Sequence, residues 1–425
     1  MPDPESVRYF LTIVSLIWVG LSIFKPTFGV MGYLTIMILR PGLYFPEFAA
    51  YRVELIVGVI ALLVSLLNGG LQRIMENRLA LPGKMFLIYG VMLVSMVQAM
   101  DFTVSYDWMW EFSKVLAFFI MVLSLLKDEK DVELFIWTFG LITIMIAYEA
   151  IYNSLQGLVV ERGEMNYAIA DKGYGSGHVA LANMCLQAAP FFWYMALNRE
   201  SSFAKMISIV IFGICLGGTL VAGSRGGMVG IVAMFGMMVY FSENRGPLIA
   251  LGICVGLIAP FFGSEGYLEY MKSILAFGSD KADVSASSRI AGLRHGIEMM
   301  IHRPLLGVGP GCYPIARKMW FGWGLWAHNL YGEIAGDLGM IGIIVWFSFL
   351  YRYIKAALVM RLNETLTPIS RNILTGIVVA TGVRLVLGMG SHSLYVFFWY
   401  IMAAMVVVFA YNIPTPIDLD SKEKS

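Results

Sequence analysis

WMWEFSKVLAFFIMVLSLL, residues 108–126, and VELFIWTFGLITIMIAYEAIY, residues 132–152, are two long apolar stretches that are separated only by the polar residues KDEKD. A helix needs about 20 mostly apolar residues to cross the hydrocarbon core of a bilayer. The pair therefore predicts two membrane-spanning helices that are joined by a short polar turn.

The rest of the chain repeats this pattern. Further apolar stretches occupy residues 53–67, 85–100, 178–197, 206–222, 226–241, 248–262, 328–350, 373–389 and 394–411. The stretch 9–39 is interrupted by Lys25-Pro26 and is either two short helices or one broken pair, so the total is 12 or 13 spans. Hydrophobic residues make up 58% of the chain and charged residues only 14%, against about 45–50% and 25% in a soluble domain. We predict an all-α, polytopic membrane protein.

The orientation follows from the lysines and arginines in the short connections, because these residues accumulate on the cytoplasmic side. The basic set comprises Arg73, Arg78, Lys84, Lys127, Lys130, Arg199, Lys205, Arg245, Arg352, Lys355, Arg361 and Arg371. The opposite short connections hold only Arg162 and Lys172, so we expect the first set and the C-terminal tail to be cytoplasmic. The net charge of +1 gives no reason to expect a nucleic-acid partner.

One connection, residues 263–327, is much longer than the others and is expected on the outer side. Its segment SSRIAGLRHGIEMMIHR has apolar residues at a helical period, and Arg303-Pro304 ends that helix before GVGPG turns the chain. The predicted division is an N-terminal helical bundle over 1–262, this helical periplasmic loop over 263–327, C-terminal spans over 328–411 and a cytoplasmic tail over 412–425.

The first candidate for chemistry is Arg225 in GSRGG, residues 223–227, which lies between two predicted spans at their outer ends. A charge near the bilayer is costly unless it is paired or hydrated. The flanking glycines let backbone N–H groups approach a ligand, and a guanidinium beside the start of a helix suits a phosphate. The alternative is an interfacial arginine that reaches towards lipid headgroups.

The second and third candidates lie in and after the long loop. Arg289 and Arg294 fall on the predicted loop helix, where arginines are suited to grip a diphosphate by forked hydrogen bonds; the alternative is a solvated basic helix face.

His328 opens the next span, with Gly332, Gly336 and Gly339 behind it on a narrow face that permits close helix packing. An imidazole titrates near working pH, so His328 is either a catalytic base or a structural residue.

Three further residues are expected to support such a site: Asn329 beside the histidine, Asp337 further along the same span, and His178 after GYGSG at another outer helix start. The sequence contains no Walker A loop, GxSxG, HExxH or paired-cysteine motif. We therefore expect no cofactor and no metal site.

The motifs SRGG, an arginine before a helix, RPLLGVGPG and HNLYGEIAGDLGMIG, taken in this order, resemble the O-antigen ligase and polymerase family of bacterial envelopes. The resemblance covers residues 223–342. It implies a membrane glycosyltransferase of GT-C-like fold in the bacterial inner membrane, with its active site facing the periplasm. Arg225 and Arg289 match the family's phosphate-binding arginines, and His328 matches its histidine before the late helix. Two features depart from the pattern: Asp337-Leu338-Gly339 replaces the usual Glu-Leu-Gly, and Arg294 is an additional arginine.

What the resemblance implies is transfer of a glycan from undecaprenyl diphosphate to an acceptor hydroxyl, without a metal and with inversion at the sugar carbon. A ligase uses a lipid A-core sugar of lipopolysaccharide or a similar acceptor, and the long-loop motifs favour this reading. A polymerase of the same family, acting on another lipid-linked repeat as in exopolysaccharide synthesis, is the alternative. A flippase or exporter of lipid-linked glycans is the third reading, but the distinctive residues crowd the outer interface and the two halves of the chain do not resemble each other.

Overall fold

Each apolar stretch of the sequence forms a helix in the computed structural model, because a backbone in lipid must satisfy its N–H and C=O groups within its own segment. The structure describes residues 4–76, 79–157, 160–162, 165–167, 177–197, 201–259 and 284–413. Lys172, the first part of the long loop (263–283) and the tail from residue 414 lie outside these ranges.

Six described helices are long and apolar enough to cross a membrane: α7 (Phe102–Leu125), α8 (Glu129–Leu155), α9 (His178–Leu197), α10 (Ser202–Val221), α16 (Leu330–Met360) and α17 (Pro368–Gly388). Shorter apolar helices are α2 (Thr27–Leu39), α4 (Val53–Leu67), α6 (Leu81–Val97), α11 (Arg225–Phe241), α12 (Gly246–Ile258) and α18 (Phe398–Tyr411). The prediction of an all-α, multi-pass membrane protein is confirmed. A two-stranded antiparallel ladder, β1 (Val160–Arg162) with β2 (Met165–Tyr167), is an addition to it.

The ambiguous first stretch forms two helices, α1 (Pro4–Leu21) and α2, which pack against each other. The turn between them contains Lys25-Pro26, and Pro26 directly precedes α2. On α1, Arg8 is fully buried; its guanidinium donates to the Leu39 carbonyl (3.0 Å) and forms an ion pair with Glu149 of α8. A buried arginine is tolerated here because its charge is paired with a carboxylate and one guanidinium nitrogen also donates to a backbone carbonyl.

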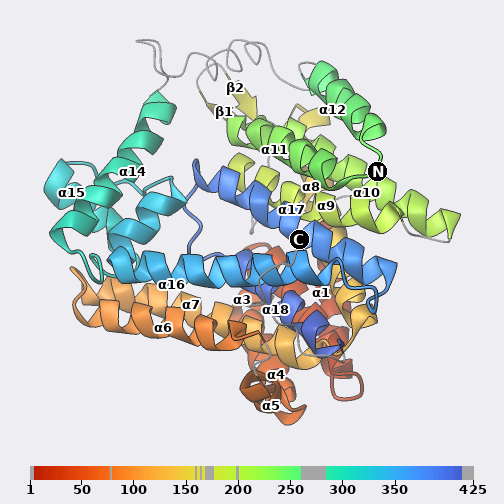
Figure 1. The fold of residues 1–425 in the computed structure, drawn as a ribbon, viewed down its shortest axis with the longest axis horizontal. Coiled ribbons are helices and arrows are strands. Elements are labelled where there is room, and N and C mark those ends of the chain that lie inside the picture. Colours follow the sequence, from red (N-terminus) through yellow and green to blue (C-terminus); the bar gives the residue numbers. More distant parts are fainter. Residues whose placement is uncertain are drawn as a thin grey trace, which may run out of the picture. The chain divides into compact units, whose positions relative to one another are not determined.

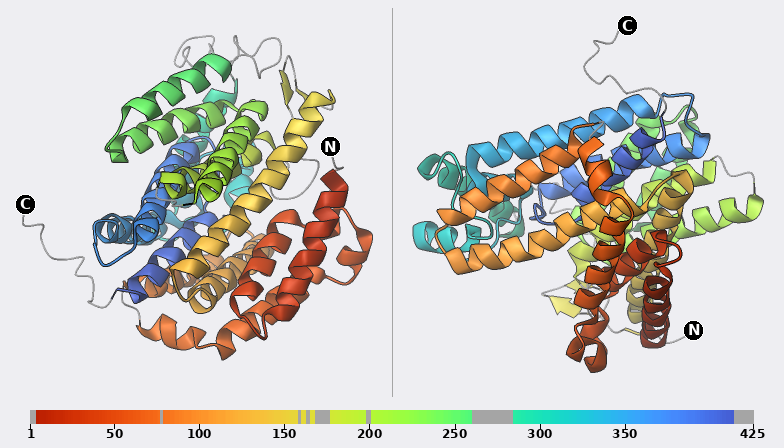
Figure 2. Two further views of the ribbon diagram at one scale, coloured as in Figure 1. Left: turned by 90° about the vertical axis from the view of Figure 1, so that its right-hand side faces the viewer. Right: turned by 90° about the horizontal axis from the view of Figure 1, so that it is seen from below.

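The helices group into two compact units. The first combines Met1–Gly70, Ser124–Leu275 and Met360–Arg384, and the second combines Leu71–Leu123, Ala276–Val359 and Leu385–Ser425. In the first unit, α1, α2 and α4 lie side by side (Figure 2). The remaining short elements are the 3-10 helix η1 (Pro41–Leu43) and α3 (Pro46–Ala50) in the first unit, and α5 (Gly70–Glu76), α14 (Val284–His302) and α15 (Tyr313–Phe321), which belong mainly or wholly to the second.

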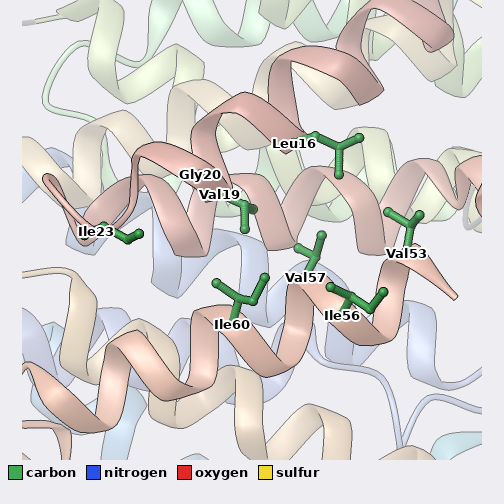
Figure 3. A pocket seen from close by; sticks show the side chains of 8 residues that line it. All are labelled: Leu16, Val19, Gly20, Ile23, Val53, Ile56, Val57 and Ile60. Carbon is green, nitrogen blue, oxygen red and sulfur yellow. The ribbon is translucent and has the colours of Figure 1, made fainter. Parts of the chain in front are cut away.

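An apolar groove runs between α1 and α4 in the first unit (Figure 3). It has a volume of about 320 Å³ and is lined by Leu16, Val19, Gly20, Ile23, Val53, Ile56, Val57 and Ile60. None of the described residues that line it has a polar side chain, so this groove can accommodate a hydrocarbon chain and its described lining has no group for acid–base or phosphate chemistry.

In the second unit, α6, α7 and α16 lie side by side, and α14 and α15 lie at the end where α16 begins (Figure 1). Lys84 of α6 donates to Ser348 of α16 (2.5 Å), and Arg352 of α16 donates to the Leu79 carbonyl just before α6 (3.2 Å). These contacts hold the beginning of α6 against the C-terminal half of α16.

Helix α16 is interrupted at Gly339, whose φ of 64° and ψ of −159° are accessible essentially only to glycine. The loop segment after α14 fills the break. The amides of Val308 and Gly309 donate to the carbonyls of Gly336 (2.8 Å) and Asp337 (3.0 Å). In return, the amides of residues 340 and 341 donate to the carbonyls of residues 304 and 305 (2.8 and 3.1 Å). The RPLLGVGPG turn is therefore part of the core of this unit.

Candidate functional site

His328 is the last residue but one before α16, and its side chain is exposed. Its backbone has a φ of 46°, which is uncommon for a residue with a Cβ atom. Such a conformation persists only where neighbouring contacts enforce it, and it is found preferentially at functional sites. The contacts that enforce it here come from three elements of the second unit.

The first contact is the helix cap. The Oδ1 of Asn329 accepts a hydrogen bond from the amide of Gly332 (3.0 Å), so Asn329 caps the start of α16. Its Nδ2 donates to the carbonyl of Met389 (3.1 Å) at the end of α17. Asn329 therefore links the start of α16 to the segment 389–393, which we call the GSHS loop after its residues 390–393.

The second contact is the packing of α14. A Cβ atom at Gly292 would lie 1.8 Å from the Ala327 carbonyl oxygen, and one at Gly296 would lie 2.2 Å from the Gly332 carbonyl oxygen. The backbone of α14 thus touches the backbone just before and just inside α16. The predicted close packing of the α16 glycines is confirmed, and their partners are α14 and the 303–313 segment.

The third contact comes from Arg317 of α15, which is 1% exposed. Its guanidinium donates to the carbonyls of Trp326 (2.9 Å) and Leu325 (3.4 Å) and to Nδ1 of His295 on α14 (3.1 Å). Burial and the charge of Arg317 lower the pKa of His295, so its ring accepts this bond in the neutral state. Arg317 was not among the predicted site residues, because only the tertiary structure shows which carbonyls it holds.

Arg289 lies one turn before Gly292 and on the same face of α14. Its Nε and Cζ are 3.5 and 3.7 Å from the position that a Cβ of Gly390 would take, so its guanidinium lies directly over the GSHS loop. Arg289 and His328 therefore both contact this loop. The structure brings these two predicted residues to the same place in the second unit.

Arg294 points elsewhere. It follows Arg289 by five residues, which places it on a different face of the helix. Its side chain is 77% exposed and forms an ion pair with Glu298 (2.8 Å between Nε and Oε1). Its geometry is that of a solvated helix face.

The GSHS loop contributes a further histidine that the set of predicted site residues omits. The ring of His392 lies 5.3 Å from that of His328, centroid to centroid, at an interplanar angle of 61°, and stacks on Trp326 at 5.2 Å and 14°. Glu333 of α16 holds the end of the loop, because its Oε2 accepts hydrogen bonds from the amides of Ser393 and Leu394 (both 2.8 Å).

Asp337 is fully buried and holds the loop after α14. Its Oδ1 accepts from the amide of Tyr313 (2.9 Å), and its Oδ2 accepts from the amide of Gly311 (3.0 Å) and the hydroxyl of Tyr395 (2.7 Å). The carboxylate of Asp337 therefore holds two backbone amides of the loop after α14 and the hydroxyl of Tyr395 in place.

Arg225 and His178 belong to the first unit. Arg225 is the first residue of α11; Ser224 caps this helix by accepting from the amide of Gly227 (3.3 Å), and Gly223 has a φ of 60°. A Cβ at Gly227 would lie 3.0 Å from that of Ala182 on α9. The starts of α9 and α11, which carry His178 and Arg225, therefore lie at the same end of this unit. The convergence of Arg225 with His328 stays a prediction.

Residues 207–347 match the family model described as O-antigen ligase. The matched stretch includes Arg225, Arg289, Arg294, His328, Asn329 and Asp337, while His178 and His392 lie outside it. No curated protein matches the chain.

Proposed function

Since the chain belongs to the O-antigen ligase family through residues 207–347, we propose that it transfers a glycan from undecaprenyl diphosphate to an acceptor hydroxyl. The acceptor that we propose is a lipid A-core sugar or a similar sugar. The site is proposed to face the periplasm from the inner membrane.

One observation supports this proposal most directly: Arg289 and His328, from separate elements, both contact the GSHS loop at the start of α16. A guanidinium suits a diphosphate, and an exposed imidazole suits a hydroxyl that has to lose a proton. The two groups supply what glycosyl transfer from a lipid diphosphate needs, which is stabilisation of the leaving group and activation of the acceptor.

In the proposed reaction, His328 takes the proton of the acceptor hydroxyl while the hydroxyl oxygen attacks the anomeric carbon. The bond between that carbon and the diphosphate oxygen breaks, and the diphosphate leaves with the electron pair. Arg289, with Arg225 in the same role, offsets the negative charge that grows on the diphosphate. Direct displacement inverts the anomeric carbon, and no metal ion is required because the diphosphate is already a good leaving group.

The test is a transfer assay with the purified full-length protein, an undecaprenyl-diphosphate glycan and candidate acceptors, in the presence of EDTA. Wild-type protein is expected to form product with inverted configuration. His328→Ala is expected to reduce kcat by about 10²–10⁴-fold, the usual contribution of a general base, while donor binding stays unchanged. A covalent glycosyl–enzyme intermediate, or normal transfer by the variant, would contradict the mechanism.

A matched control is His302→Ala. His302 is an exposed histidine at the end of α14 whose ring contacts Trp320 at 5.3 Å and 60°, nearly the geometry of the His328–His392 pair. This variant is expected to transfer normally. Product on a lipid A-core acceptor identifies a ligase, product on a second lipid-linked repeat identifies a polymerase, and donor translocation without any transfer would point to a flippase.

A further inference from the structure

We infer that His392 is a positioning residue for His328, and that it fixes the ring of the proposed base through direct ring contact. The inference rests on the proposed role of His328 and adds a residue that lies outside the stretch matched by the family model. It is argued from three properties of the GSHS loop.

The loop is held by contacts at both of its ends. Glu333 binds the amides of residues 393 and 394, Asn329 binds the carbonyl of residue 389, and Arg289 covers Gly390. A Cβ atom at position 390 would take up the space next to the guanidinium. Because the backbone on both sides of His392 is held in this way, its ring is presented in one place.

The His392 ring itself is held between two neighbours. The imidazole of His392 stacks nearly parallel on the ring of Trp326 and meets the ring of His328 at a steep angle. Trp326 is two residues before His328, and its carbonyl is bound by the buried Arg317. Trp326, His392 and His328 are therefore joined by one stacked and one edge-on ring contact, and the backbone of Trp326 is held by Arg317.

The two histidines differ in exposure, and this assigns them different roles. His328 is exposed, whereas His392 is mostly covered and its Nδ1 is buried without a hydrogen-bond partner among the described residues. Burial and the neighbouring His328 lower the pKa of His392 to about 4. At neutral pH His392 is therefore uncharged and does not oppose a proton on His328. Among the described residues, Arg289, Glu333 and Tyr395 are further charged or titratable groups next to the loop.

The experiment compares two substitutions at His392 in the purified full-length protein. His392→Leu keeps the approximate volume of the side chain but removes the flat ring, and His392→Phe keeps an aromatic ring that cannot titrate. We expect the leucine variant to lose about tenfold to 100-fold in kcat, since a misplaced catalytic group costs rates of that order, with an unchanged KM for the lipid diphosphate donor. The phenylalanine variant is expected to recover to within about threefold of the wild type.

His302→Leu is the matched control, and it is expected to behave as wild type. Equal kcat for wild type and His392→Leu would overturn the inference, and so would a loss in the leucine variant that phenylalanine does not restore. Thermal unfolding of each variant identifies misfolded protein. If the leucine variant is misfolded, the transfer rate of the phenylalanine variant alone decides whether the inference stands. Absence of transfer by the wild-type protein contradicts the proposed function instead, so the two failures are distinguishable.

Discussion

At the scale of single residues, the two loop arginines differ although they lie five residues apart on one helix. Arg289 shares a face with Gly292 and Gly296, which pack against the start of α16, and its guanidinium lies over the GSHS loop. Arg294 is exposed and paired with Glu298 in an i, i+4 ion pair. Pairs of this kind contribute little to stability in water.

We therefore expect Arg289→Ala and Arg294→Ala to have opposite outcomes. The first variant is expected to lower the transfer rate by about 10²-fold or more, as loss of one preorganised donor does, and the second is expected to stay within about threefold of wild type. Initial rates at saturating acceptor provide the comparison. Equal losses in both variants would mean that the two arginines share the diphosphate, as the sequence alone allowed.

The sequence identifies residues whose chemistry is unusual for their position, but it does not identify the residues that hold them. His328 and Arg289 stand out because both belong to a recognisable order of motifs, although Arg289, which the sequence places at the start of a helix, lies in the second turn of α14. Arg317 and Trp326 have no such signal, since an arginine on a short amphipathic helix reads as solvated. Their contribution depends on which carbonyl and which ring they meet in the folded chain.

At the scale of elements, the contact between α14 and α16 sets the position of the site. Helix α14 ends at His302, directly before Arg303-Pro304, as the helical period and the proline predict. The two helices touch backbone to backbone through Gly292, Gly296 and Gly332. Any side chain at these positions has to displace the backbone next to His328.

Gly292→Ala tests this contact. The new Cβ would overlap the carbonyl of Ala327, and forced overpacking of this kind costs about 1–3 kcal/mol. We expect a lower unfolding temperature and at least about a tenfold loss of transfer, because the residue that is displaced adjoins His328. Gly90→Ala on α6 is the control: nothing lies within 4 Å of its Cβ position, and alanine favours a helix by about 1 kcal/mol. Equal stability of the two variants would show that α14 does not pack as described.

The interruption of α16 could not be foreseen from the sequence. Gly339 belongs to a series of glycines that reads as a packing face, and glycine occurs in continuous membrane helices as well as in broken ones. The break becomes necessary only because the turn at 303–309 supplies donors and acceptors to both of its sides. This hydrogen bonding arises only in the folded chain, and the apolar pattern around Gly339 does not predict it.

At the scale of the whole molecule, the apolar stretches predict the class of the elements well, because lipid permits few alternatives to a helix. The undecided stretch at 9–39 forms two helices. The sidedness of the chain follows from the distribution of basic residues alone.

Cysteine labelling of spheroplasts tests this sidedness. Cys185, Cys215 and Cys312 are buried, so Cys254→Ser gives a suitable background. In it, Trp323→Cys, in the exposed connection between α15 and α16, is expected to react with an impermeant maleimide. Glu364→Cys, in the exposed turn between α16 and α17, is expected to react only after permeabilisation. The reverse pattern would place the proposed site in the cytoplasm.

The exchange of hydrogen bonds across Gly339 has a consequence for turnover. Many enzymes admit their substrates by swinging a surface loop aside on a flexible hinge. Here the segment that follows α14 is bound to α16 by four backbone hydrogen bonds and by the carboxylate of Asp337. Releasing it would expose all of these groups at once. A rigidly held segment of this kind suits a reaction whose large substrates enter and whose products leave without any movement of this segment.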